Sequence, residues 1–247
     1  MEISLVIPAY NEEAVIGTCL ETAIKNGKGR FKEIIVVDNA STDRTSEIAR
    51  SYPGVTVVRE ERKGTGNARQ TGFEHTTGDI VAYIDSDSLI PEHWVDMIEW
   101  WFNGDPNLVF LSGAYRYHKG DYYPAWFLDF IWWFSMPAYW AVGYMGNTGN
   151  CAVRSSALKK IGGFDRSILF YGDDTDLSRR LHKVGRTVWS LQFYNYSSPR
   201  RFEQAGIFTT SWTYMLNYWW PVLFHKPFTP GHHFIKAHKT AARGTER

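Results

Sequence analysis

Two aspartates, Asp85 and Asp87, follow an apolar run at residues 80–84 in the segment DIVAYIDSDS. Alternate residues of an extended chain share one face, so both carboxylates would project to the same side. Two carboxylates placed in this way can share a hard divalent cation such as Mg²⁺ or Mn²⁺, with diphosphate oxygens completing its ligand shell. The alternative is a solvent-exposed turn in which Asp and Ser form local hydrogen bonds. We favour the cation site because the pair follows a fully apolar strand, where uncompensated charge would be costly.

A second acidic group, Asp173, Asp174 and Asp176, opens a helix predicted over residues 172–185, whose apolar side chains recur at helical spacing. Acids at a helix N-terminus are favourable for capping and for the helix dipole alone. Three acids in four residues exceed what a cap requires. We therefore interpret one of them as a general base that points into a cleft.

Two shorter segments each allow a functional and a purely structural interpretation. PAYNEE (residues 8–13) could line a nucleotide through Asn11 or Glu12, but Asn and Glu also suit the start of a helix. KGTGNAR (residues 63–69) couples two glycines to two cations, which could pair with phosphates. This segment matches neither the P-loop nor the dinucleotide-binding fingerprint, so a plain turn is an equal alternative.

The segments that must position these residues alternate between strand and helix patterns in the first half of the chain. The apolar pattern predicts strands at residues 3–8, 34–37, 55–58 and 80–84, and helices at residues 12–24, 41–50 and 66–76. Strands that are apolar on both faces and separated by helices indicate an α/β fold with a mostly parallel sheet, covered on both sides. Ligands bind such sheets beyond the carboxyl ends of the strands. Polar residues follow these ends, so we expect the acids to lie at the mouth of the sheet.

The composition limits the class of protein. The 247 residues are 44% hydrophobic and 21% charged, which suits one large α/β domain, and we find no internal repeat or linker. A net charge of +1 gives no reason to expect a nucleic-acid partner. The two cysteines, Cys19 and Cys151, lack metal-type spacing and indicate packing residues in a reducing compartment rather than a disulfide. The first residues show no secretory signal, so we expect a cytoplasmic protein.

Five motifs occur in an order that resembles one enzyme family. IPAYNEE, VVDNASTDRT, the acidic DSDS, GNCAVR and GDDTDL, which lie within about residues 1–190, resemble the family 2 glycosyltransferases of GT-A fold. Each motif is weak alone, but the ordered set is specific. The resemblance implies a Rossmann-like sheet and a metal-dependent, inverting transfer of a sugar. The donor would be a nucleoside-diphosphate sugar, UDP- or GDP-linked, and the acceptor a hydroxyl group. A sugar nucleotidyltransferase on a similar sheet and a non-catalytic scaffold that binds a nucleotide sugar are the alternatives.

The same resemblance assigns catalytic and metal-binding roles. Asp174 would be the catalytic base, with Asp173 beside it where the family usually has Glu. Asp87, together with Asp85, would hold the divalent cation, Mn²⁺ or Mg²⁺, that bridges the diphosphate.

Further residues would contact the two substrates. Gly149 and Asn150 would lie on the acceptor side. Arg201, paired with Arg200 in SSPRRF, lies where many relatives carry a basic residue near the diphosphate, although paired arginines also occur as plain surface patches. The residues expected at the nucleotide sugar are Pro8, Ala9, Tyr10, Glu12, Asp38, Asn39, Lys63, Arg69, Asp85, Ser86 and Arg201.

Aromatic residues make up 16% of the chain, including 11 Trp, and they gather after Tyr115. Residues 131–145 are apolar but too short to span a membrane, and Pro137 interrupts them. Residues 207–224 predict an amphipathic helix, with Thr210, Thr213 and Asn217 on one side and Trp212, Met215, Trp219 and Val222 available to the other. A basic tail follows. We therefore divide the chain into a GT-A domain, 1–205, and an aromatic helix with a basic tail, 206–247.

This second region has two interpretations. A Trp-rich amphipathic helix beside a basic tail fits binding in the plane of an anionic membrane surface. The alternative is a helix docked on the catalytic domain, with its Trp rings as packing. Under the first interpretation the acceptor is lipid-linked or membrane-proximal, and the protein works at the inner face of the cell membrane.

Overall fold

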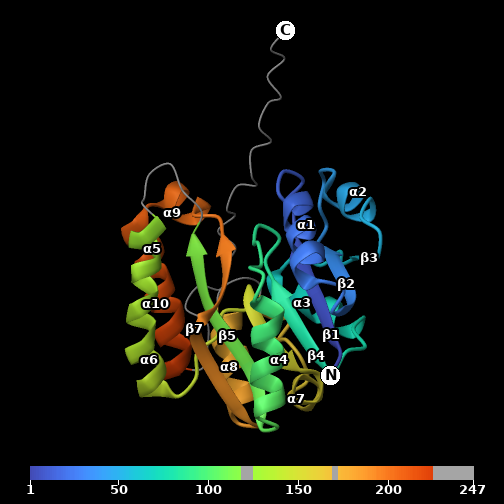
Figure 1. Ribbon diagram of the computed structural model, residues 1–247. Coiled ribbons are helices and arrows are strands. Elements are labelled where there is room, and N and C mark those ends of the chain that lie inside the picture. Colours follow the sequence, from blue (N-terminus) through green and yellow to red (C-terminus); the bar gives the residue numbers. More distant parts are fainter. Residues whose placement is uncertain (118–124, 169–171, 225–247) are drawn as a thin grey trace.

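The computed structural model describes residues 1–117, 125–168 and 172–224. Within these residues, seven strands form one sheet in the order β3-β2-β1-β4-β6-β5-β7 (Figure 1). All neighbouring strands are parallel except at β6, which is antiparallel to both β4 and β5. The prediction of a mostly parallel sheet is therefore confirmed. The strands are β1 (Ile3–Ala9), β2 (Phe31–Asp38), β3 (Val55–Arg59), β4 (Ile80–Ile84), β5 (Leu108–Tyr117), β6 (Asn150–Arg154) and β7 (Arg186–Ser197).

The first half of the chain follows the predicted alternation, with differences at the helix starts. The helices are α1 (Ile16–Gly27), α2 (Thr45–Arg50), α3 (Thr65–Glu74) and α4 (Trp94–Gly104). Helix α1 begins at Ile16 rather than at Glu12, because Asn11 adopts a left-handed φ of 53° and the chain turns before the helix starts. Helix α2 likewise begins late, at Thr45, whose backbone amide donates to Asp43 Oδ1 at 3.0 Å.

The hydrophobic pattern did not reveal α4, β5 or β7. After β5 the helices are α5 (Ala125–Ile131), the 3₁₀ helix η1 (Trp132–Phe134), α6 (Ser135–Val142), α7 (Ser155–Lys160), α8 (Asp173–His182), α9 (Arg200–Ala205) and α10 (Ile207–Phe224). The helices predicted over 172–185 and over 207–224 are confirmed in type.

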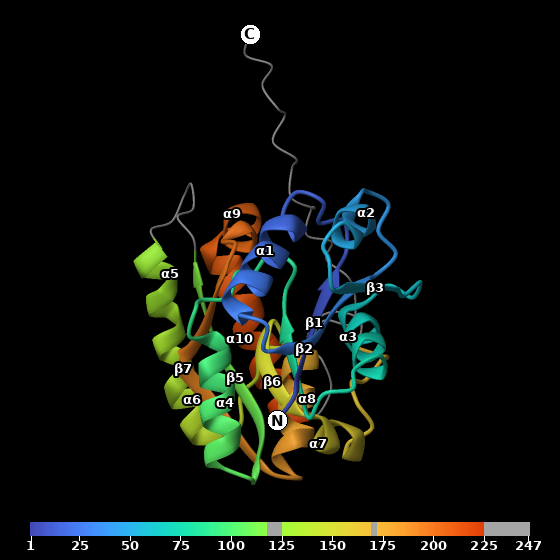
Figure 2. The ribbon, with the colours of Figure 1, turned by 45° about the vertical axis from the view of Figure 1, so that its right-hand side comes forward.

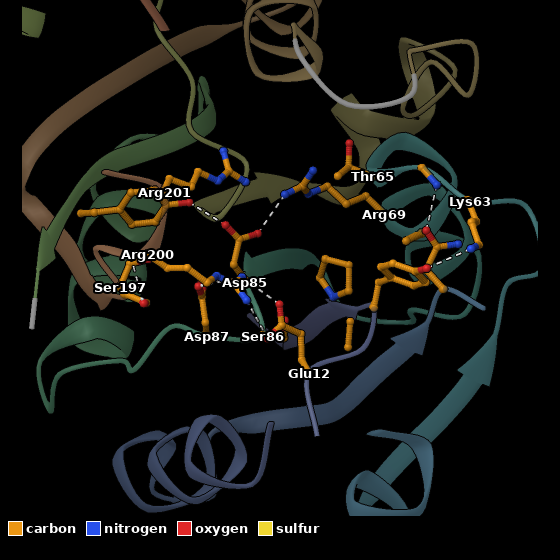
Figure 3. Close-up of a pocket in the computed structure, with 18 of the residues that line it drawn as sticks. Glu12, Lys63, Thr65, Arg69, Asp85, Ser86, Asp87, Ser197, Arg200 and Arg201 are labelled. Atoms are coloured by element: carbon orange, nitrogen blue, oxygen red, sulfur yellow. Dashed lines mark hydrogen bonds and ion pairs between the residues drawn. The ribbon is translucent and has the colours of Figure 1, made fainter. Parts of the chain in front are cut away.

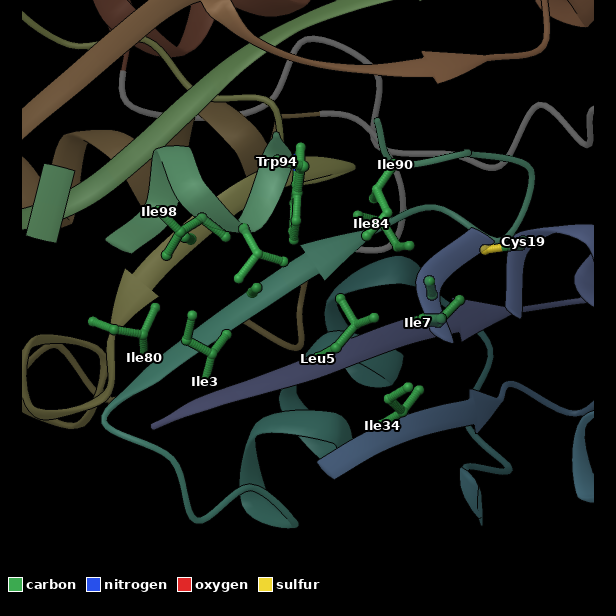
Figure 4. Packing of buried hydrophobic residues seen from close by; sticks show 14 of the residues in the cluster. Ile3, Leu5, Ile7, Cys19, Ile34, Ile80, Ile84, Ile90, Trp94 and Ile98 are labelled. Atoms are coloured by element: carbon green, nitrogen blue, oxygen red, sulfur yellow. The ribbon is translucent and has the colours of Figure 1, made fainter. Parts of the chain in front are cut away.

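Two apolar layers lie on opposite faces of the sheet, because successive strand residues point to opposite sides. On one face, Ile3, Leu5 and Ile7 of β1 pack with residues of α1 and α4 (Figure 4). On the other face, Val6 packs with residues of α3, α7 and α8. Cys19 and Cys151 lie buried, one in each layer, and neither forms a disulfide, as predicted.

The aromatic second half packs against the β5 and β7 end of the sheet (Figures 1 and 2). Trp132 of η1 lies 5.7 Å from Trp189 of β7, ring centre to ring centre, and Tyr218 of α10 joins the same cluster. None of the described helices is both long and apolar enough to cross a lipid bilayer. The basic tail predicted after Phe224 lies outside the described residues.

Candidate active site

A pocket of about 190 Å³ opens beyond the carboxyl ends of β1 and β4, where the strand pattern predicted a ligand site (Figure 3). Most of the predicted donor-binding and metal-binding residues line it. They are Pro8, Ala9, Tyr10, Glu12, Asn39, Lys63, Arg69, Asp85, Ser86, Asp87 and Arg201. Asp38, Gly149, Asn150, Asp173 and Asp174 are not among the lining residues.

Asp85 lies in the pocket with both carboxylate oxygens engaged. Arg69 Nη2 donates to Oδ1 at 3.0 Å, and the hydroxyl of Tyr115 donates to Oδ2 at 2.7 Å. The chain here is a turn, closed by a hydrogen bond of 3.0 Å from the Ser88 amide to the Asp85 carbonyl, so the extended-chain argument for the pair was wrong. The turn still leaves both Asp85 and Asp87 in the pocket wall.

Asp87 shares a guanidinium with Glu12. Arg200 Nη2 lies 3.5 Å from Asp87 Oδ2 and donates to Glu12 Oε1 at 2.9 Å. All three side chains are at most 16% exposed, so bulk water screens these charges weakly. Arg200, the first residue of α9, thus places a cation from late in the chain beside the acids that follow β1 and β4.

The acids fit a divalent cation whose shell is completed by a substrate. The described residues contain no group of three or more His, Cys, Asp or Glu able to hold a metal by themselves. Mg²⁺ sites commonly use one or two carboxylates and take their remaining ligands from water and substrate phosphates. Asp87 and Asp85, which both border the pocket, supply a donor set of that kind.

Arg69 connects the pocket to the start of α8. Its side chain is 6% exposed, and its guanidinium lies between Asp85 and Asp173, with Nη1 donating to Asp173 Oδ2 at 2.7 Å. Burial and the neighbouring Asp174 carboxylate raise the pKa of Asp173, although Arg69 opposes the shift. Asp173 is therefore an internal partner of Arg69.

Asp174 lies next to this network and is more exposed than Asp173. The backbone amide of Thr148 donates to Asp174 Oδ1 at 2.6 Å, and the Thr148 hydroxyl donates to the same oxygen. These bonds orient the carboxylate from the loop that precedes β6.

The β2 end of the pocket is held by Asn39. Its side-chain Nδ2 donates to the carbonyl of Arg62 at 2.7 Å, and its side-chain Oδ1 accepts from the Gly64 backbone amide at 2.9 Å. This shapes the loop that carries Lys63, whose ammonium group donates to the Tyr10 hydroxyl at 2.9 Å. Asp38, only 1% exposed, pairs instead with Arg59 at 2.5 Å behind the wall.

Comparison with known proteins decides the family. Residues 4–162, more than half of the chain, match the model of the family described as glycosyl transferase family 2. The chain is a family 2 glycosyltransferase.

Curated relatives of this glycosyltransferase match it over part of its length. It is 35% identical over 100 residues to glycosyltransferase AglE of Haloferax volcanii, covering 38% of this chain and 33% of that protein. It is 38% identical over 98 residues to the glucosyl-3-phosphoglycerate synthase of Mycolicibacterium smegmatis, covering 36% and 32%. The matched region thus spans about a third of the length of these relatives.

Solved structures extend the likeness to most of the glycosyltransferase chain. The mannosyltransferase PcManGT from Pyrobaculum calidifontis, in complex with GDP-Man and Mn²⁺, has a TM-score of 0.64 at 22% identity, covering 79% of this chain and 56% of that one. The glucosyl-3-phosphoglycerate synthase from Mycobacterium tuberculosis, in complex with Mn²⁺, UDP and phosphoglyceric acid, has a TM-score of 0.62 at 22% identity, covering 90% and 78%. At this identity the likeness shows the fold, which is GT-A, as predicted.

One wall of the pocket was not predicted from the sequence of this glycosyltransferase. Tyr115 and Tyr117 come from β5, and Tyr214 comes from α10. The alternation in GAYRY was a usable signal, since residues two apart on a strand share a face. Nothing local indicated that this face meets the end of β4, 30 residues away.

Proposed function

We propose that this chain transfers a sugar from a nucleoside-diphosphate sugar, UDP- or GDP-linked, to a hydroxyl acceptor with inversion at the anomeric carbon. The observation that carries the proposal is the convergence of Asp85 and Asp87, Arg69 and Arg201 from three separate segments around one pocket. The neighbouring PcManGT and glucosyl-3-phosphoglycerate synthase structures, with GDP-Man or UDP and with Mn²⁺, support this choice of donor.

The charge distribution suits a diphosphate. Arg201 lies half-buried in the pocket wall, where its guanidinium donates to the Tyr214 hydroxyl at 3.2 Å. Burial opposes its charge, but Tyr214 and Asp85 outweigh burial and raise the pKa of Arg201, so the side chain stays cationic. With Lys63 at the opposite end of the pocket, these cations can bind the phosphate oxygens of the donor.

Asp87 and Asp85 would hold a divalent cation, Mn²⁺ or Mg²⁺, beside the diphosphate. When bound, such a cation offsets the negative charge that builds on the leaving group. Arg200 and Arg201 lie on the same side of the pocket and can interact with that charge as well.

We assign the general base to Asp174. Thr148 occupies Asp174 Oδ1 with two hydrogen bonds, so the acceptor proton would pass to Oδ2 as the acceptor oxygen attacks the anomeric carbon. Asp173 is a poorer candidate because it is 7% exposed and paired with Arg69. Its role is to position Arg69, and through Arg69 the carboxylate of Asp85.

The aromatic second half supports a proposal for the acceptor and for the location. We propose a lipid-linked or membrane-proximal hydroxyl acceptor, used in the cytoplasm at the inner face of the cell membrane. Tyr214, which lines the pocket, supports this because it belongs to α10. Residues 1–205 would form the catalytic unit and residues 206–247 the membrane-associating region.

The test compares Asp174→Asn with Asp176→Asn. Asp176 lies on the same helix but pairs with Arg179 and Arg180 at 2.9 and 2.7 Å, away from Thr148. With UDP- and GDP-sugars as donors, release of the nucleoside diphosphate should fall by at least about a hundredfold in Asp174→Asn. Donor binding should persist in both variants, and Asp176→Asn should keep its turnover.

Equal turnover in wild type and Asp174→Asn would remove the base assignment. A sugar nucleotidyltransferase would release pyrophosphate, and a scaffold would bind donor without releasing a product, so the same assay separates both alternatives.

A further inference from the structure

Helices α5, α6 and α10, with η1, expose large apolar side chains to solvent. Phe208 is 89% exposed, Trp140 72% and Trp126 71%, and Trp133 and Trp212 are exposed at 66% and 61%. We call this set of five residues the aromatic face. Monomeric soluble proteins rarely leave so many large apolar side chains uncovered in one region, and such regions usually mark an interaction site.

Helix α10 buries polar side chains and exposes aromatic ones, the reverse of an ordinary surface helix. Its polar residues Thr210 and Asn217 are each 5% exposed, and the Thr210 hydroxyl donates to the Arg201 carbonyl at 3.2 Å. Its aromatic residues Phe208 and Trp212 point outward instead. In water, the apolar stripe of a helix normally faces the core and the polar side faces solvent. This orientation therefore suits an apolar environment outside the protein.

The segments that carry the aromatic face are almost free of charge. Residues 125–145 and 207–224 contain a single charged residue, Asp129. Asp129 Oδ1 accepts a hydrogen bond of 3.1 Å from the Tyr117 amide, and burial raises the pKa of its carboxyl group. A typical protein surface is about a quarter to a third charged residues. A polar protein partner would leave this surface poorly matched.

We propose that the aromatic face inserts into the interfacial region of an anionic lipid bilayer. Trp and other aromatic rings are favoured at that depth, between headgroups and acyl chains. The chain that continues from α10, residues 225–247, carries five Lys or Arg against one Glu, so its charge is complementary to anionic headgroups. A neutral aromatic surface followed by a cationic segment combines the two contributions that interfacial binding uses.

Two of the segments that carry the aromatic face, η1 and α10, also adjoin the donor pocket. Trp132 of η1 packs on Tyr115 at 5.9 Å between ring centres, and Phe202 packs on Tyr214 at 6.2 Å. Tyr115, Phe202 and Tyr214 all line the pocket. If the proposed function holds, a hydroxyl carried by a lipid-linked acceptor would reach the donor along this wall, so the inference deepens that proposal by naming the surface that meets the lipid.

The experiment is flotation of the full chain with vesicles of phosphatidylglycerol and phosphatidylcholine, and with vesicles of phosphatidylcholine alone. The variants are Trp133→Ser, Trp212→Ser and the double substitution. The control is Trp100→Ser, because Trp100 is exposed to the same 66% as Trp133 but lies on α4, outside the aromatic face. Donor binding is followed in parallel by thermal shift with nucleotide sugars.

We expect the wild type to float with the anionic vesicles and to bind them more weakly at high salt. Each single variant should lose about tenfold in vesicle affinity and the double variant about a hundredfold, since each substitution removes one Trp ring that the bilayer would bury. Trp100→Ser should bind within about twofold of wild type. Donor binding should be unchanged in all of them.

Three results would overturn the proposal. The wild type could fail to float at low salt, or Trp133→Ser and Trp212→Ser could both bind as tightly as Trp100→Ser. The wild type could instead form a dimer that these two substitutions dissociate, which would show that a second copy covers the face. Vesicle binding without any sugar transfer would leave this proposal standing and refute the proposed function, so the two fail separately.

Discussion

Gly149 is a position where one methyl group should disable the pocket without unfolding the protein. A Cβ added there would lie 2.0 Å from the Tyr115 hydroxyl and 2.1 Å from Asp85 Oδ2, whereas ordinary contacts are at 3.4–4 Å. Gly149 does not have a positive φ, so Gly149→Ala adds a steric clash without backbone strain. Asp85 or Tyr115 must move by more than about 1 Å to relieve it.

The expected magnitudes follow from what such a shift breaks. Losing the hydrogen bond of 2.7 Å from Tyr115 to the Asp85 carboxylate, together with overpacking, should lower the free energy of unfolding by about 2 kcal/mol. A displacement of about 1 Å at a substrate-positioning carboxylate should lower kcat/KM by about a hundredfold. Urea unfolding, calorimetric donor titration and release of the nucleoside diphosphate measure the three effects.

Two companion variants separate sterics from chemistry. At Gly104, the last residue of α4, an added Cβ meets no atom within 4 Å, so Gly104→Ala should change the free energy of unfolding by less than about 0.5 kcal/mol. Tyr115→Phe removes the hydroxyl with which the new methyl group collides, so its effect should be smaller in the Gly149→Ala background than in wild type. If Gly149→Ala matched Gly104→Ala in both stability and donor affinity, the close packing around Asp85 would not matter and the reasoning would fail.

Three further substitutions test the buried charges. Arg69→Met should lower the free energy of unfolding by about 3 kcal/mol at neutral pH in urea titrations, because the buried carboxylate of Asp173 and the half-buried carboxylate of Asp85 lose their cation. The loss should shrink as pH falls, since protonation removes the uncompensated charge, and a loss that grew on acidification would contradict this. In Glu60→Gln, the wild-type hydrogen bond from Arg62 that lowers the pKa of Glu60 to about 2 is weakened, so stability should fall by about 2 kcal/mol at neutral pH. A pKa that is lower in the folded than in the unfolded state stabilises the fold fully only above the unfolded pKa. The difference in stability between wild type and Glu60→Gln should therefore vanish as pH drops from the usual glutamate range through about 2. A difference that did not change with pH would disprove this linkage. Arg200→Gln removes the guanidinium 3.5 Å from Asp87, so calorimetry without donor should show Mn²⁺ binding about tenfold tighter, whereas unchanged affinity would mean that Arg200 does not compete with the cation.

The first four strands and the position of the ligand site could be predicted from local pattern. Each of these strands is a short apolar run, and β4 occupies the predicted residues, Ile80–Ile84, without change. Polar residues directly after β1, β2 and β4 predicted the mouth of the sheet, and the pocket lies there. These predictions succeeded because burial on both faces and the rule for parallel sheets act on a few neighbouring residues at a time.

The second half was harder because its residues serve contacts far away in the chain. Strands β5 and β7 pair with each other although the aromatic helices separate them in the sequence, and no periodicity in either segment predicts that pairing. The amphipathic pattern of α10 was seen in the sequence, but pattern alone left open which side faces the protein. Packing shows that the polar side does, since Thr210 and Asn217 are buried and Trp212 is not.

The amino-acid order thus specified the chemistry available to this glycosyltransferase: its acids, its cations and the strand ends that carry them. Folding determined how these groups are paired. Arg69 bridges Asp85 and Asp173, and Arg200 reaches Glu12 from 188 residues away. Side-chain charge is a property of one residue, whereas a distance of 3 Å between residues of remote segments depends on the strand order of the whole sheet.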